Sequence, residues 1–133
     1  MAHLEHHSIA TALAALEAAP LSRRKAMLLV LLIDAGIDRM AGDDPLAHRA
    51  AVAVHDPALA LVMELAAMRE DGPRLVLEAV TVSAQEAVGL SEADYMVSLY
   101  NGATVQRVRI AWPDGRREDA LSLLRQAAAA LER

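Results

Sequence analysis

The chain has 133 residues, which predicts a single domain over residues 1–133. Apolar residues make up 55 % of the chain and the mean hydropathy is +0.24, which excludes an intrinsically disordered or collagen-like protein. The formal net charge of −5 argues against nucleic acid as a partner, and the absence of cysteine excludes disulfides, thiolate catalysis and cysteine-ligated zinc.

Two helices are predicted before residue 42. Residues 1–7 are expected to form a disordered tail. Residues 8–19 follow the spacing of an amphipathic helix, whose buried stripe is Ile9, Ala12, Leu13 and Leu16. Ser22 can cap a second helix from 23 to about 41, which is apolar on every side at its middle. We therefore expect this second helix at the centre of the fold.

The apolar run at the middle of that helix also bears on membrane association. It covers only the eight residues from Ala26 to Ile33, and Asp34 follows it directly. About 20 apolar residues are needed to span a bilayer. We expect no membrane role and a cytoplasmic location.

Two further helices share one start signal, a capping aspartate followed by proline at the first helical position. Asp44-Pro45 begins a short helix to about residue 54, and Asp56-Pro57 begins another to about residue 70. The helix after Asp56-Pro57 is apolar from 58 to 68 except for Glu64. A small monomer has little room to bury such a helix, so we expect it to contribute to a homodimer interface.

The second half of the chain predicts a small antiparallel sheet. Residues 75–82 have the composition of a strand. Residues 91–100 are open to two interpretations, a strand leading into a hairpin at Asn101-Gly102 or a helix that starts with a capping box at Ser91. We favour the hairpin, in which paired residue numbers sum to 203 and Asp94 lies opposite Arg109.

The chain closes with a turn and a helix. Pro113-Asp114-Gly115 is a turn sequence, and residues 117–132 carry the apolar spacing of a last helix, with Leu121, Leu124, Ala128 and Leu131 on its buried face. The predicted fold is thus α+β: four N-terminal helices, a small antiparallel sheet containing the hairpin at Asn101-Gly102, and a C-terminal helix. With 29 alanines and no phenylalanine, the core must depend on close helix approach.

Asp34 and Asp38 are the first candidate for a binding site. They are spaced i and i+4, which places both carboxylates on one helix face, and neither has a basic residue four positions away. With His48 they could line a small-molecule or metal-binding pocket. Two carboxylates are too few for a metal site by themselves, so we expect no bound metal, and the alternative is that the pair faces water.

Arg23, Arg24 and Lys25 are the second candidate. They lie in the first turn of the predicted second helix, where unpaired backbone amides and three cations could together bind an anion. The alternative is a solvated charge run neutralised by acidic neighbours.

The sequence contains no nucleotide-binding, hydrolase, metalloprotease or zinc motif, and it points to no cofactor. We therefore expect a non-catalytic, homo-oligomeric interaction or accessory protein. The alternative function is a small-molecule or metal-binding domain, which could also be an enzyme, with its pocket near Asp34, Asp38 and His48.

Overall fold

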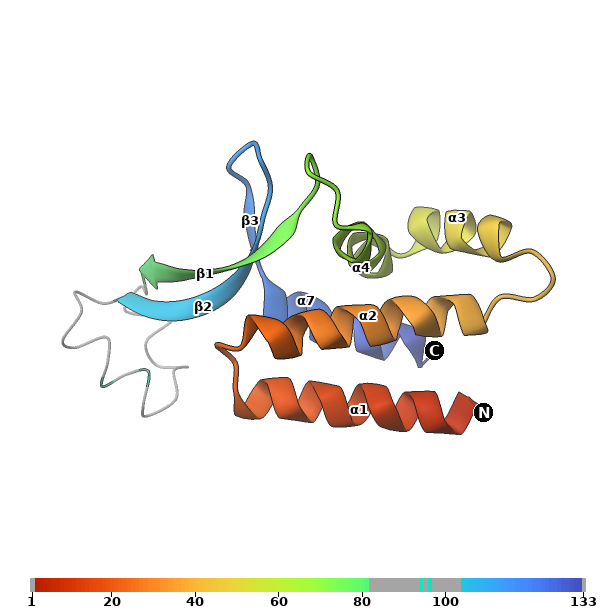
Figure 1. The fold of residues 1–133 in the computed structure, drawn as a ribbon, viewed down its shortest axis with the longest axis horizontal. Coiled ribbons are helices and arrows are strands. Elements are labelled where there is room, and N and C mark those ends of the chain that lie inside the picture. Colours follow the sequence, from red (N-terminus) through yellow and green to blue (C-terminus); the bar gives the residue numbers. More distant parts are fainter. Residues whose placement is uncertain (1, 82–93, 95, 97–103, 133) are drawn as a thin grey trace.

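The computed structural model describes residues 2–81, 94, 96 and 104–132 and shows the predicted α+β architecture (Figure 1). Four helices precede a three-stranded antiparallel sheet, and a C-terminal helix follows it. The elements are α1 (Ala2–Ala18), α2 (Arg23–Arg39), α3 (Pro45–His55), α4 (Pro57–Ala67), β1 (Arg74–Thr81), β2 (Thr104–Ala111), β3 (Arg117–Asp119) and α7 (Ala120–Leu131).

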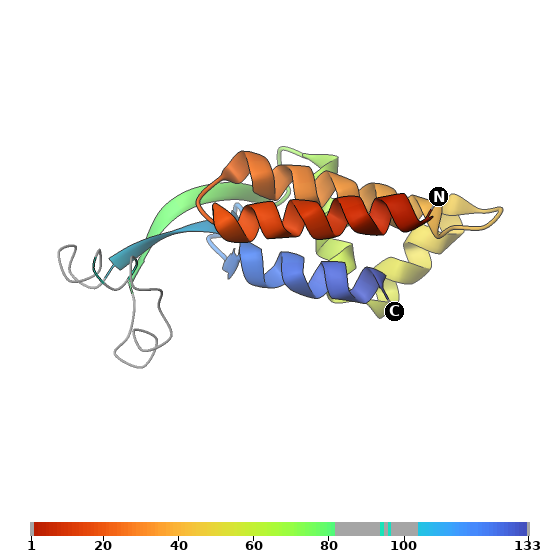
Figure 2. The same cartoon turned by 90° about the horizontal axis from the view of Figure 1, so that it is seen from below.

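Helix α2 lies at the centre, as its apolar sequence predicts. It packs against α1, α4 and α7, and Figure 2 shows α1, α2 and α7 running alongside one another. Its side chains toward these helices are buried: Ala26, Leu29, Val30, Ile33 and Ile37. The predicted stripe of α1 packs on the same core, with Ile9, Ala12 and Leu16 buried and Leu13 partly buried.

The predicted helix starts are confirmed by their capping hydrogen bonds. The Ser22 hydroxyl accepts a hydrogen bond from the Lys25 backbone N–H at 3.1 Å. The Asp44 carboxylate accepts one from the N–H of Ala47, and the Asp56 carboxylate accepts from two N–H groups in the first turn of α4. Each cap satisfies donors that have no partner inside the helix.

Helix boundaries differ from the predictions at two places. Helix α1 begins at Ala2, inside the segment 1–7 expected as a disordered tail, because extending a formed helix adds a hydrogen bond for each residue ordered. Helix α4 ends at Ala67 and not near residue 70. Met68 follows it in the left-handed conformation, with φ 52°, which stops the helix.

Helix α4 owes its apolar sequence to burial within its own chain. It packs against α2 and α7, and its buried residues are Ala58, Leu59, Leu61, Val62 and Leu65. Burial within the chain thus accounts for much of its apolar sequence, and a homodimer interface on this helix stays a prediction.

The sheet has the order β1-β2-β3, in which β2 pairs with β1 and β3. The favoured strand over residues 91–100 is wrong at the described positions, because Asp94 and Met96 are helical, as in the alternative interpretation. Arg109 pairs with Val76 on one side and with Asp119 on the other, so Asp94 is not its cross-strand partner. Asp94 instead forms an ion pair with Arg107 at 3.0 Å. The proposed turn at Asn101-Gly102 lies outside the described residues. Val108 and Ile110 of β2 are buried in the core.

The third strand comes from residues predicted to open the last helix. The turn at 113–115 joins β2 to β3, with the Trp112 N–H donating to the Arg116 carbonyl at 3.0 Å and Gly115 at φ 96°. Residues 117–119 then pair with β2. Asp119 ends the strand by capping α7, accepting a hydrogen bond from the Ser122 N–H at 2.9 Å. The capping bond thus begins the helix after β3.

Gly36 lies at a close contact between helices in this core without phenylalanine. It is buried on α2, and a Cβ atom built on it would lie 2.7 Å from Leu131 Cδ2 of α7 and 3.5 Å from Ile9 Cδ1 of α1. A side chain at this position would therefore require Leu131 to move. Close approach recovers dispersion contacts that larger rings would otherwise supply.

The close approach predicts a matched pair of glycine variants. Gly36→Val should lower the free energy of unfolding by about 1–3 kcal/mol because the added methyls overpack the contact with Leu131. Gly42→Val should change it by less than about 0.5 kcal/mol, since nothing lies within 4 Å of its Cβ position. Urea unfolding followed by circular dichroism measures both. Equal effects would mean that the helices do not meet at Gly36.

Candidate functional site

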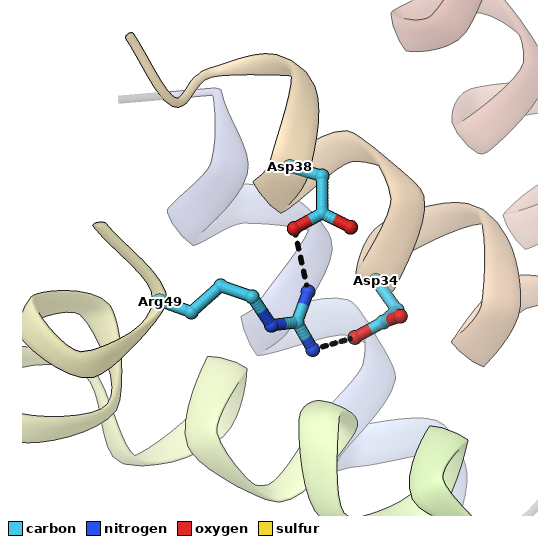
Figure 3. Close-up of polar contacts among 3 residues, drawn as sticks. All are labelled: Asp34, Asp38 and Arg49. Carbon is cyan, nitrogen blue, oxygen red and sulfur yellow. Dashed lines mark hydrogen bonds and ion pairs between the residues drawn. The ribbon is translucent and has the colours of Figure 1, made fainter. Parts of the chain in front are cut away.

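Asp34 and Asp38 share a face of α2, as their spacing predicts, and both are bound by one side chain of α3 (Figure 3). The Arg49 guanidinium donates from Nη2 to Asp34 Oδ1 at 2.6 Å and from Nη1 to Asp38 Oδ1 at 2.9 Å. The fork of the guanidinium thus spans two carboxylates one helical turn apart. This three-residue cluster is called the Arg49 clamp below.

The clamp is partly shielded from water. The Asp34 side chain is 23 % exposed and that of Arg49 is 27 % exposed, whereas Asp38 is 51 % exposed. The hydrogen bond to Asp34 is the largest influence raising the pKa of Arg49 above its ordinary value, against a smaller opposing effect of burial. The raised pKa keeps Arg49 charged, and the stability that this shift contributes is lost as pH rises through the pKa of Arg49 in the folded state.

The clamp positions α3, which has no fully buried residue of its own. Val52 is its one partly buried apolar side chain packed against the core among the described residues. Arg49 adds a polar attachment to the central helix at the same part of α3. Without that attachment, α3 would keep few contacts that fix its orientation on α2.

Sequence reasoning missed Arg49 because it considered partners only at helical spacing. Arg49 lies 15 residues after Asp34 and 11 after Asp38, and it reaches them through a loop and a second helix. One signal was present: Arg49 is the only arginine or lysine in α3, opposite the only acidic residues in α2. Locating the pair required the packing of the two helices.

The structure does not join His48 to the two aspartates. Its side chain is partly exposed, and within the described part of the chain it has no hydrogen bond or ion pair to Asp34 or Asp38. A ligand at the two carboxylates would have to displace Arg49 from both of them. Arg49 would thus compete with any ligand for the carboxylates of the hypothetical pocket.

Arg23, Arg24 and Lys25 are exposed in the first turn of α2. Among the described residues none of the three forms an ion pair, so acidic neighbours do not neutralise them directly. Exposed cations are strongly screened at physiological ionic strength. Anion binding here stays a prediction, since no second feature of the structure marks a ligand position.

Among the described residues, the two large apolar side chains with the highest exposed fractions lie on α3. Leu46 is 81 % exposed and Val54 is 78 % exposed. These residues and the exposed alanines between them follow the i, i+4, i+8 spacing of one helix face. This face, called the α3 stripe below, comprises Leu46, Ala47, Ala50, Ala51 and Val54.

Metal and membrane sites are both absent from the described residues. No group of three or more histidine, aspartate or glutamate side chains is placed to hold a metal ion in residues 2–81, 94, 96 and 104–132. Over the same residues, no helix has the length and hydropathy needed to cross a bilayer. Comparisons with protein-family models, with curated proteins and with solved structures found no match to this chain.

The clamp predicts a stability difference between two ion pairs of this chain. Arg49→Met should lower the free energy of unfolding by about 1–2 kcal/mol, because it leaves two carboxylates facing each other on α2. Arg125→Met breaks an ion pair of 2.9 Å to Glu17 whose partners are 53 % and 42 % exposed, and it should cost less than about 0.5 kcal/mol.

A double-mutant cycle with Asp34→Asn assigns the loss at Arg49 to the contact itself. We expect a larger coupling for Asp34 than for Asp38, because Asp34 is less exposed and its contact with Arg49 is shorter. Urea unfolding supplies all the free energies. A coupling of zero to Asp34 would show that the clamp does not fasten α3.

Proposed function

We propose that this chain is a non-catalytic interaction protein that self-associates through the α3 stripe. One observation carries the proposal: the α3 stripe is exposed along the helix while the clamp holds α3 on α2. A fixed exposed apolar face of this kind is typical of an interaction surface. Figure 1 shows α3 at one end of the molecule, away from the sheet, where a partner can approach it.

The occupant that fits the stripe is a second copy of the same chain. A two-fold axis near Ala50 would place the stripe on itself as an antiparallel helix pair, with Leu46 of each copy near Val54 of the other. The alanines between them permit close approach of the two backbones.

The expected dimer is weak and reversible. An 11-residue helix is about 16 Å long, and one such helix buries less than the roughly 800 Å² per partner of a standard interface. The monomer already buries its own core, so it can fold without its partner. Association therefore depends on protein concentration.

Concentration-dependent light scattering tests the proposal. The average mass should rise from that of a monomer toward that of a dimer as concentration increases, and Leu46→Glu or Val54→Glu should abolish the rise by placing a charge inside the apolar contact. Leu28→Glu is the matched control, because Leu28 is 51 % exposed on α2 and outside the stripe. Circular dichroism establishes that each variant is folded.

Disulfide trapping locates the contact. The chain has no cysteine, so Ala50→Cys introduces a single thiol near the expected two-fold axis. Mild oxidation should link two copies through Cβ atoms about 4 Å apart, whereas Gln106→Cys on β2 should remain monomeric. A constant monomer mass, or equal trapping of both variants, would contradict self-association through α3.

A further inference from the structure

A groove of about 440 Å³ opens between the α3–α4 junction, the β2–β3 turn and α7. Its volume lies within the range of small-molecule sites, about 300–1,000 Å³. The apolar part of its lining comes from all three regions: Ala53, Pro57, Leu61, Trp112 and Leu123. A ligand with an aliphatic body can therefore lie on a surface already formed by the fold.

Two carboxylates from different elements line the same groove. Glu64 is the single charged residue within α4, and Glu118 lies on β3. Within the described part of the chain neither side chain has a hydrogen bond or ion pair. A second hollow of about 210 Å³ adjoins the groove, shares Glu118 with it and adds the carboxylate of Asp119.

The one cation in the lining of the groove is held against an aromatic ring. The Arg116 guanidinium carbon lies 4.0 Å from the centroid of the Trp112 ring. The hydrogen bond from the Trp112 backbone N–H to the Arg116 carbonyl keeps the two residues opposite each other across the β2–β3 turn. Arg116 is thus a cation–π partner of Trp112, and it forms no ion pair with Glu64 or Glu118 among the described residues.

We propose that this groove binds an organic cation, an ammonium or guanidinium group carried on an apolar body. The body would lie on Pro57, Leu61 and Leu123, and the charged head would lie between Glu64 and Glu118. The charged lining of the groove consists of two carboxylates without an ion pair and one guanidinium stacked on Trp112. Its net charge is therefore negative and favours a cation. This site is separate from the α3 stripe and does not depend on self-association.

Tryptophan fluorescence can measure binding in the groove. Trp112 is its only tryptophan and lines the groove, so its fluorescence should respond when a probe enters. The probe is hexylammonium, and hexanol and hexanoate are its controls with the same apolar body. We expect a saturable change with hexylammonium, and binding at least about five-fold weaker for both controls.

Three variants test the assigned residues. Glu64→Gln and Glu118→Gln should each weaken hexylammonium binding about three- to five-fold, since each removes one partly solvated charge contact. Glu70→Gln, an exposed carboxylate outside the groove, should leave it unchanged. Arg116→Gln should tighten it, because it removes the cation that repels the probe.

The outcomes separate the cation site from its alternatives. Equal binding of hexanol, or no effect of Glu64→Gln and Glu118→Gln, would show nonspecific apolar contact and overturn the proposal. Preferred binding of hexanoate, weakened by Arg116→Gln, would assign the groove to an anion. No saturable binding of any probe would also overturn it. Repeating the titration with Leu46→Glu keeps the result independent of self-association.

Discussion

The close approach of α2 to its neighbours is the constraint on which the rest of the structure depends. A core with no phenylalanine gains its dispersion energy from many short aliphatic contacts, and these require helix axes that lie near one another. Gly36 lies where α2 meets Leu131 of α7 and Ile9 of α1, and α7, which also packs against α4, buries three alanines. Because α2 is enclosed on these sides, its charged residues lie at its two ends and on the face that α3 approaches.

The Arg49 clamp is a consequence of that enclosure. Asp34 and Asp38 occupy the part of α2 that α1, α4 and α7 do not bury, and α3 approaches the same face. A carboxylate partly removed from water needs a compensating charge, and Arg49 supplies it to both residues at once. The two aspartates that could have suggested a ligand site thus have a structural partner that positions α3.

Local signals account for the parts of the fold that could be predicted. Capping side chains at Ser22, Asp44 and Asp56 act within three residues of themselves, so the helix starts could be predicted from the sequence. The turn at 113–115 was equally local. The central place of α2 could be inferred from a run of apolar residues that no surface helix would carry.

Long-range pairing accounts for the parts that could not be predicted. Arg109 has Val76 and Asp119 as its cross-strand partners, and the predicted register with Asp94 was equally consistent with alternation of apolar residues. Residues 117–119 continue the helical spacing of residues 120–132. They nevertheless form β3, because the turn places them beside the edge of β2 that β1 does not occupy. A left-handed residue after a helix is usually glycine, so Met68 in that position could not be recognised from the sequence as the end of α4.

The two proposed surfaces meet at α3, which explains why the position of that helix matters. Ala53 lines the groove, whereas its neighbour Val54 belongs to the stripe, because successive residues of a helix point about 100° apart. A small rotation of α3 about its axis would therefore move one wall of the groove and the stripe together. Arg49 opposes that rotation through its hydrogen bonds to Asp34 and Asp38 of α2. A change at the clamp would thus shift Ala53 and Val54 together without contacting either residue.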